Sequence, residues 1–183
     1  NKGIPINIKN SFAPKDAGTV IEKKPKNTGS TVSGISSINN ISLISLEGSG
    51  MVGIPGFSKR LFETLAAQKI NVILITQSSS EHSICVGIDA HNAKTAKAAI
   101  DELFAYEIAT KKVEPLVVEN NLAIIALVGD QMKNHTGISG RLFTALGKNG
   151  VNIRAISQGS SERNISAVIN KADIKKAINV IHE

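Results

Sequence analysis

Two polar clusters in the sequence carry side chains that are suited to binding. The first lies within ITQSSSEHSI, residues 75–84, and the second within ISQGSSERNI, residues 156–165. Each cluster begins with a glutamine, Gln77 or Gln158, whose amide both donates and accepts hydrogen bonds, and continues with serine hydroxyls and a glutamate. The clusters therefore serve a ligand or an interface, unless they only shape the end of a strand and the turn after it.

Both clusters belong to an internal duplication. Residues Asn40–Glu102 align without a gap to Asn121–Glu183, at a constant offset of 81 positions. Core packing explains why leucine, isoleucine and phenylalanine recur, but it gives no reason to repeat polar residues. The repeated positions that we select as candidate binding residues are Met51, Gly56, Ser58, Asn71 and Gln77 in the first repeat, and Met132, Gly137, Ser139, Asn152 and Gln158 in the second.

These candidates also have purely structural explanations. The two glutamines could cap strand ends, and the two asparagines follow a helix, where asparagine is favoured for backbone reasons alone. Glu81 and Glu162 are more typical of solvated turn residues or partners of arginine than of ligand contacts. Residues 52–55, VGIP, break the repeat against residues 133–136, KNHT, so the two loops can differ in affinity.

The sequence has no recognisable catalytic motif. It lacks a phosphate-binding glycine loop of the Walker type, a recurring pair of nucleophile and base, and a cluster of cysteine and histidine that could hold a metal. We therefore predict no catalytic residue, no metal and no cofactor in this chain. The missing initiator methionine and the end at Glu183, inside a helical pattern, indicate a piece of a longer protein.

Charge and composition exclude further classes of partner. The net charge of +6 is concentrated before residue 27, whereas residues 27–183 contain 15 basic and 13 acidic side chains, and only 3% of residues are aromatic. Proteins that bind single strands stack bases on aromatic side chains, so we predict no nucleic-acid partner. The longest apolar runs have the length of a strand, which excludes a membrane span. A single cysteine, Cys85, excludes an intrachain disulfide and fits a reducing, cytoplasmic location.

The hydrophobic periodicity of the repeats predicts alternating strands and helices. In the first repeat we predict strand 41–46, helix 57–69, strands 71–76 and 83–88, a helix capped by Asn92 with a buried face of Ala96, Ala99, Ile100 and Leu103, and strand Val113–Val118. In the second we predict strand 122–128, helix 138–148, strands 151–157 and 164–170, and helix 174–181 capped by Asp173. A βαββαβ unit folds as an antiparallel sheet with both helices on one face. The sequence therefore predicts an α+β protein of two ferredoxin-like units.

The second repeat lacks a counterpart of the strand Val113–Val118. A spare strand pattern precedes the first repeat, in Thr31–Ile38. If this strand completes the second sheet, the first unit (41–120) is inserted within the second (121–183), and residues 31–40 supply the missing strand.

The residues that carry a family resemblance are the loop and helix at 48–62, followed by LITQSSSEHSI and repeated later as AISQGSSERNI. They resemble the paired ACT domains of aspartate kinases, and the two polar clusters look most like those of the bifunctional aspartokinase–homoserine dehydrogenases. Upstream, Ile4, Ile6 and Ile8 alternate as in a short strand, and residues 16–30 have the composition of a linker. Residues 5–21 are similar to the segment that closes the kinase domain of these enzymes, so residues 1–30 are predicted to end that domain.

The resemblance implies a regulatory role, in which the ACT pair binds an end-product amino acid, threonine in the bifunctional enzymes. The carboxylate of threonine would meet N–H groups where Gly56 or Gly137 leads into a helix. Its ammonium group would meet backbone carbonyls near Asn71 or Asn152. Its hydroxyl would meet the amide of Gln77 or Gln158.

The resemblance also implies a homodimer formed through the ACT units. ATP and NAD(P) would belong to the parent enzyme, with the kinase before residue 1 and the dehydrogenase after Glu183. Two alternatives remain at this point. The chain could be the regulatory region of a monofunctional aspartokinase that senses lysine, or a dimerisation module without a ligand.

Overall fold

The computed structural model describes residues 3–22, 31–77 and 82–182, and it divides into two compact units, residues 1–30 and 31–183. In the smaller unit, β1 (Ile6–Ile8) pairs antiparallel with β2 (Thr19–Ile21). The strand predicted from the alternating isoleucines is confirmed over these three residues. The prediction of a linker over residues 16–30 is wrong at β2, because the β-branched run Thr-Val-Ile favours a strand. Residues 23–30 of that predicted linker lie outside the described residues.

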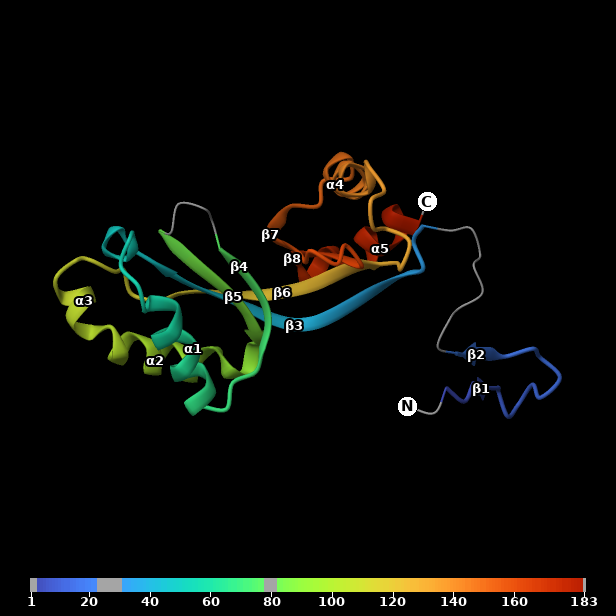
Figure 1. The fold of residues 1–183 in the computed structure, drawn as a ribbon, viewed down its shortest axis with the longest axis horizontal. Coiled ribbons are helices and arrows are strands. Elements are labelled where there is room, and N and C mark those ends of the chain that lie inside the picture. The colour runs from blue at the N-terminus through green and yellow to red at the C-terminus, as the bar shows by residue number, and fades with distance from the viewer. Residues whose placement is uncertain (1–2, 23–30, 78–81, 183) are drawn as a thin grey trace. The chain divides into compact units, whose positions relative to one another are not determined.

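Residues 31–183 contain one six-stranded antiparallel sheet in the order β4-β5-β3-β6-β8-β7 (Figure 1). The strands are β3 (Gly34–Glu47), β4 (Val72–Gln77), β5 (Ser83–Asp89), β6 (Val117–Val128), β7 (Ile153–Gln158) and β8 (Asn164–Asn170). β4 and β5 belong to the first repeat unit, and β7 and β8 belong to the second. The central strands β3 and β6 are long, because each serves both units.

The two halves of each central strand have different neighbours. Residues 34–38 of β3 pair with 124–128 of β6, in the second repeat unit, whereas residues 41–45 pair with 117–122, in the first. The pairing predicted between Thr31–Ile38 and a strand of the second repeat is therefore confirmed from Gly34 onwards. Each central strand was predicted as two separate strands, which is wrong because the Asn-Asn pairs at 39–40 and 120–121 shift the register without ending the strand.

The first repeat unit carries its helices on one face of the sheet. Both α1 (Phe57–Ala67) and α2 (Ala93–Leu103) share one core with β3 and β5. Its largest fully buried side chains are Ile44, Leu46, Leu61, Leu65, Ile84, Ile88, Ile100 and Phe104. Leu103 was predicted to face this core but is 37% exposed, and Phe104 is buried in its place. The reason is a further short helix, α3 (Ala105–Ala109), which the hydrophobic pattern did not predict.

The caps of the second helices lie earlier than predicted. A 3-10 turn, Ala90–Asn92, precedes α2, and the Asp89 side chain caps it by accepting a hydrogen bond from the N–H of His91 at 3.2 Å. Asn92 makes no side-chain capping bond, so its prediction as the cap is wrong. The second repeat unit has the same arrangement, with Asn170 accepting from the N–H of Ala172 at 2.9 Å. Aspartate and asparagine satisfy the same orphan donors at a helix start.

The second repeat unit has its own core on the face that carries α4 (Ile138–Lys148) and α5 (Ile174–His182). Its buried residues are Ile125, Leu127, Met132, Leu142, Leu146, Val151, Ile165, Ala167, Ile169 and Ala177. Val32 and Ile35, just before and within β3, pack against this core. Across the described ranges, no helix combines the length and the apolar character needed to cross a membrane.

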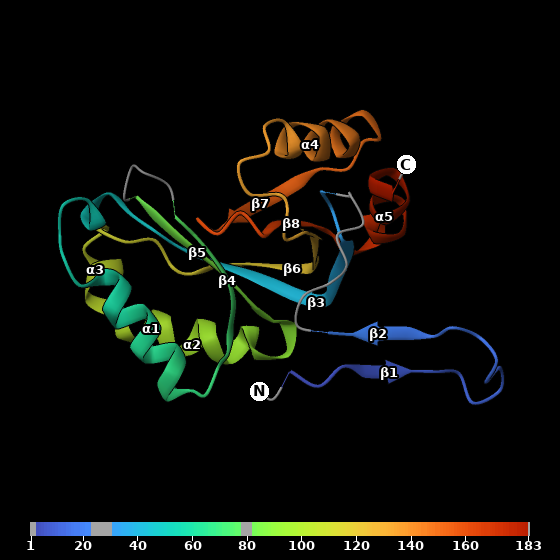
Figure 2. The same ribbon diagram turned by 45° about the vertical axis from the view of Figure 1, so that its right-hand side comes forward.

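A third core joins the helix-free faces of the two units. Ile41, Leu43 and Leu74 of the first unit pack with Leu122, Ile124 and Val168 of the second. The sheet is folded so that these faces meet, and α1 and α2 cover the outside of one half while α4 and α5 cover the outside of the other (Figures 1 and 2). The predicted α+β fold of two βαββαβ units, each with its helices on one face, is confirmed.

Candidate functional site

A cavity of about 330 Å³ lies at the start of α1 in the first repeat unit. Three segments form it: the loop after β3, the first turn of α1, and the facing ends of β4 and β5. The lining residues are Met51, Gly53, Ile54, Pro55, Gly56, Phe57, Ser58, Gln77 and Ile84. None of these side chains is charged, so the cavity suits a ligand whose charges are met by the main chain.

The backbone at Gly56 prepares this cavity for an anion. Gly56 has φ 106°, a left-handed conformation that glycine adopts without strain, and it lets the chain turn sharply into α1. The N–H groups of the first turn have no acceptor within the helix. Gly56, at the N-cap position, has no side chain that could accept hydrogen bonds from them, and the first turn contains no acidic residue. These N–H groups, together with the positive end of the helix dipole, are therefore available to a carboxylate.

The structure brings four of the five first-repeat candidates together. Met51, Gly56, Ser58 and Gln77 all line the cavity. Asn71 does not, because it lies in the exposed turn between α1 and β4. From there β4 runs back to Gln77, a span of roughly 20 Å at about 3.3 Å per residue. A small ligand in contact with Gln77 therefore cannot reach Asn71 of the same unit.

Sequence reasoning missed part of the cavity wall. Phe57 was predicted only as the first residue of a helix, yet it lines the cavity while being 9% exposed. Gly53, Ile54 and Pro55 were noted only because they break the repeat. The signal that could have identified them is their position between two candidates, Met51 and Gly56, in one short loop. Glu81 lies outside the described residues.

The second repeat unit has a related arrangement, in which the polar side chains at the equivalent place hydrogen-bond to other groups of the protein. Gly137 again precedes the helix in a left-handed conformation, with φ 88°. The hydroxyl of Ser139 donates to the amide oxygen of Gln158 at 3.3 Å, so these two candidates lie together. Met132 is buried in the core of this unit. Asn152, like Asn71, is exposed in the turn between helix and strand, at the far end of β7.

Glu162 holds the loop before α4 against the turn between β7 and β8. Its carboxylate accepts a hydrogen bond from the main-chain N–H of Asn134 at 2.7 Å. Both residues have left-handed backbones, with φ 62° at Asn134 and 52° at Glu162. Glu162 was predicted as a solvated turn residue or a partner of arginine rather than a ligand contact, and this bond to the loop is an addition that the sequence did not indicate.

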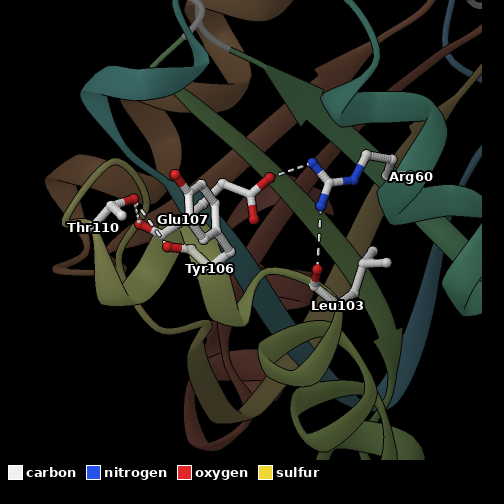
Figure 3. A network of polar contacts seen from close by, with 5 residues as sticks. All are labelled: Arg60, Leu103, Tyr106, Glu107 and Thr110. Carbon is white, nitrogen blue, oxygen red and sulfur yellow. Dashed lines mark hydrogen bonds and ion pairs between the residues drawn. The ribbon is translucent and has the colours of Figure 1, made fainter.

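An aromatic pair and an arginine stand behind the first cavity. The rings of Phe57 and Phe104 stack with centroids 5.6 Å apart, and the Arg60 guanidinium carbon lies 4.3 Å from the Phe104 centroid. Arg60 also donates to the carboxylate of Glu107 at 2.5 Å and to the carbonyl of Leu103 at 3.1 Å (Figure 3). The hydrogen bond from Arg60 is the main reason why the pKa of Glu107 lies below its ordinary value.

Within the part of the chain that the structure describes, no group of histidine, cysteine, aspartate and glutamate could hold a metal ion. Burial raises the pKa of the Cys85 thiol, which lies half-buried against the third core. This favours the protonated, unreactive thiol.

Comparisons with known proteins agree with this architecture. A family model described as the ACT domain matches residues 44–104 and 125–183. The bifunctional aspartokinase/homoserine dehydrogenase of Haemophilus influenzae is 39% identical over 182 residues, which is 100% of this chain but only 22% of that protein. The chain thus spans about a fifth of the length of that relative.

Solved structures give the same result. The aspartate kinase of Clostridium acetobutylicum, described as an allosteric enzyme, matches with a TM-score of 0.84 at 31% identity, over 98% of this chain and 41% of that one. E. coli aspartokinase III in complex with lysine and aspartate matches with a TM-score of 0.76 at 27% identity, over 98% and 38%. The two ranges matched by the family model fall within the two repeat units. The chain therefore belongs to the ACT domain family, and its two units are a regulatory ACT pair of the aspartokinase type.

Proposed function

We propose that this ACT pair binds threonine and thereby inhibits a longer protein that combines aspartokinase with homoserine dehydrogenase. The observation that carries the proposal is the joint position of Gly56, Ser58 and Gln77 around one cavity. The likeness to a bifunctional relative over the whole chain supports the choice of enzyme.

The chemistry of the cavity fits a small amino acid with an uncharged side chain. Its carboxylate would accept hydrogen bonds from the N–H groups that follow Gly56. A threonine hydroxyl needs a partner that both donates and accepts, as the amide of Gln77 does. The threonine methyl group would contact Met51 and Ile84. Its ammonium group would meet main-chain carbonyls of the loop 53–56, since Asn71 of the same unit is too distant.

Lysine is the second candidate effector. The solved E. coli aspartokinase III contains lysine, which favours a monofunctional parent. A buried ammonium group on the side chain would need a carboxylate or several carbonyls, and no acidic residue is among the described residues that line the cavity. The cavity therefore favours threonine over lysine.

We also expect the chain to form a homodimer. β4 and β7 stand at the two edges of the sheet, and Ile75 and Ile156, equivalent residues on these strands, are 49% and 42% exposed. Open strand edges of this kind are normally covered. Light scattering at tens of micromolar, with and without threonine, tests this expectation, and a monomer under both conditions contradicts it.

Calorimetric titration with threonine, lysine and methionine tests the proposed function. We expect threonine to bind and to raise the melting temperature with increasing concentration, since it binds only the folded state. Gln77→Ala should weaken binding about fivefold, because losing one hydrogen bond to a neutral group costs on the order of 1 kcal/mol. Tighter binding of lysine would favour the monofunctional parent. If none of the three amino acids gives a heat of binding, the remaining hypothesis is a dimerisation module without a ligand.

A further inference from the structure

The segment that connects α2 to β6, Phe104–Leu116, lies directly behind the first cavity. We call this segment the buttress. It contacts both walls of the cavity from outside: the N–H of Gly50 donates to the carbonyl of Lys112 at 2.9 Å, and Arg60 of α1 donates to Glu107. The loop before the cavity and the helix after it are therefore held by the same stretch of chain.

Arg60 contacts both the buttress and the last residue of α2, Leu103. One terminal nitrogen donates to Glu107, the other donates to the carbonyl of Leu103, and the planar guanidinium lies against the Phe104 ring. The side chain of Arg60 is only 37% exposed, and that of Glu107 16%. A lysine could not make these contacts, because a single ammonium group replaces the two-nitrogen fork and its flat face.

These contacts reach the cavity through Phe57. Its ring lines the cavity on one side and stacks on Phe104 on the other, with an interplanar angle of 10°. The guanidinium carbon of Arg60 is 5.8 Å from the Phe57 centroid. Arg60 thus fixes the first turn of α1, which presents Phe57 and Ser58 to the cavity.

The far end of the buttress is equally well anchored. Asp101 accepts a hydrogen bond from the N–H of Leu116 at 2.7 Å, and Lys97 donates both to Asp101 at 2.8 Å and to the carbonyl of Leu116 at 2.7 Å. β6 begins at the next residue and continues into the second repeat unit. A rigid connection therefore runs from the cavity wall to the strand that both units share.

We propose that Arg60 is a positioning residue for the first cavity, which acts through Phe57 and Glu107 to hold the first turn of α1 in its binding conformation. The ligand part of this proposal rests on the proposed function, whereas the structural part does not. The equivalent residue of the second unit, Arg141, is exposed and offers a matched control.

The test compares the full chain with the variants Arg60→Met, Arg60→Lys and Arg141→Met. Without ligand, hydrogen exchange of amides in residues 57–65 should accelerate about tenfold in both Arg60 variants and stay unchanged in Arg141→Met. With L-threonine, the affinity of the first site should fall about fivefold or more in Arg60→Met, and Arg60→Lys should recover little of it.

The variant Ile100→Val separates a purely stabilising role, because it weakens the same core at a residue that does not line the cavity. This variant should lower the melting temperature but leave threonine affinity within about twofold, since its effect is confined to packing. Arg60→Met that binds threonine as wild type, or exchange in residues 57–65 that does not change, overturns the proposal. If the wild-type chain binds no amino acid, the proposed function fails, and the exchange measurement alone still decides whether Arg60 positions α1.

Discussion

Asn40 in β3 and Asn121 in β6 have the same left-handed backbone, with φ of 59° and 60°, at equivalent places in the two central strands. Between Ile38 and Ile41, β3 has one residue more than its partner, and between Leu122 and Glu119 the extra residue is in β6. The two bulges are therefore reciprocal, and each marks where a strand passes from one unit to the other. Asparagine tolerates this conformation better than other residues with a Cβ.

We expect Asn121→Val to destabilise the chain by about 1–2 kcal/mol, because a β-branched residue is strained in the left-handed region. Asn121→Gly is the control, since glycine adopts this backbone freely. Urea unfolding of both variants measures the difference. Equal stability of the valine and glycine variants would show that β6 loses its bulge without cost.

Gly129→Ala should destabilise the contact between the second unit and the segment just before β3. A Cβ at Gly129 would lie 2.3 Å from the carbonyl oxygen of Thr31, which is main chain and cannot simply move aside. We expect a loss of about 1–3 kcal/mol, in the range of overpacking a well-filled site. Gly147→Ala is the control, since nothing lies within 4 Å of its Cβ position inside α4. That change should stabilise by about 0.5–1 kcal/mol.

The two glutamines should report on different sites. Gln77 lines an open cavity, whereas Gln158 already accepts a hydrogen bond from Ser139. In a two-site threonine titration we expect Gln77→Ala to weaken the tighter component and Gln158→Ala the weaker one, each about fivefold. The thermal shift with threonine should fall in both variants. A titration that neither substitution changes would assign both glutamines to the shape of the strand ends.

The Arg60–Glu107 pair should make stability depend on pH. The pKa of Glu107 is lowered from its ordinary value of 4.5, chiefly by the hydrogen bond from Arg60. The unfolded chain therefore takes up the proton first, so this contribution to stability is present above that ordinary value and is lost as the pH falls through the lowered pKa. Urea unfolding from about pH 7 to pH 3 should show a smaller loss in Glu107→Gln than in wild type.

Glu63→Gln is the matched control for this pH experiment. Glu63 pairs with Lys59 on the surface at 3.6 Å, with both side chains largely exposed. Such pairs contribute little to stability. A pH profile of Glu107→Gln that coincides with wild type would mean that the Arg60 contact does not survive in solution.

Hydrophobic periodicity was sufficient to predict the helices and strands of each repeat, because Leu61, Leu65, Leu142 and Leu146 recur on the buried faces. It was not sufficient for the central strands, where the Asn-Asn pairs resemble chain breaks. The structure extends the 81-residue repeat further upstream, since Val32 and Ile35 pack on one core as Val113 and Leu116 do on the other. That correspondence is hard to see in the sequence, because at the 81-residue offset Gly34 aligns with Pro115, and Ser36 and Ser37 align with Val117 and Val118.

The candidate site was predictable where polar residues recur, as at Gln77 and Ser58, but not where contact depends on the path of the backbone. Asn71 recurs with the same regularity, yet the length of β4 separates it from the cavity. Arg60 recurs as well, and only the folded structure reveals its partners Leu103, Phe104 and Glu107. Repetition therefore indicated the candidate binding residues, and the fold determined which of them line the same cavity.

The sharing of β3 and β6 sets an order of events during synthesis. Gly34 pairs with Val128, 94 positions later, so the first half of β3 has no partner when it emerges from the ribosome. At about 5–20 residues per second, it waits on the order of 5–20 s with its edge uncovered. Pairing over such a distance is intrinsically slow. The first repeat unit can meanwhile form most of its core, which leaves the early half of β3 as the segment most exposed to aggregation until the second repeat arrives.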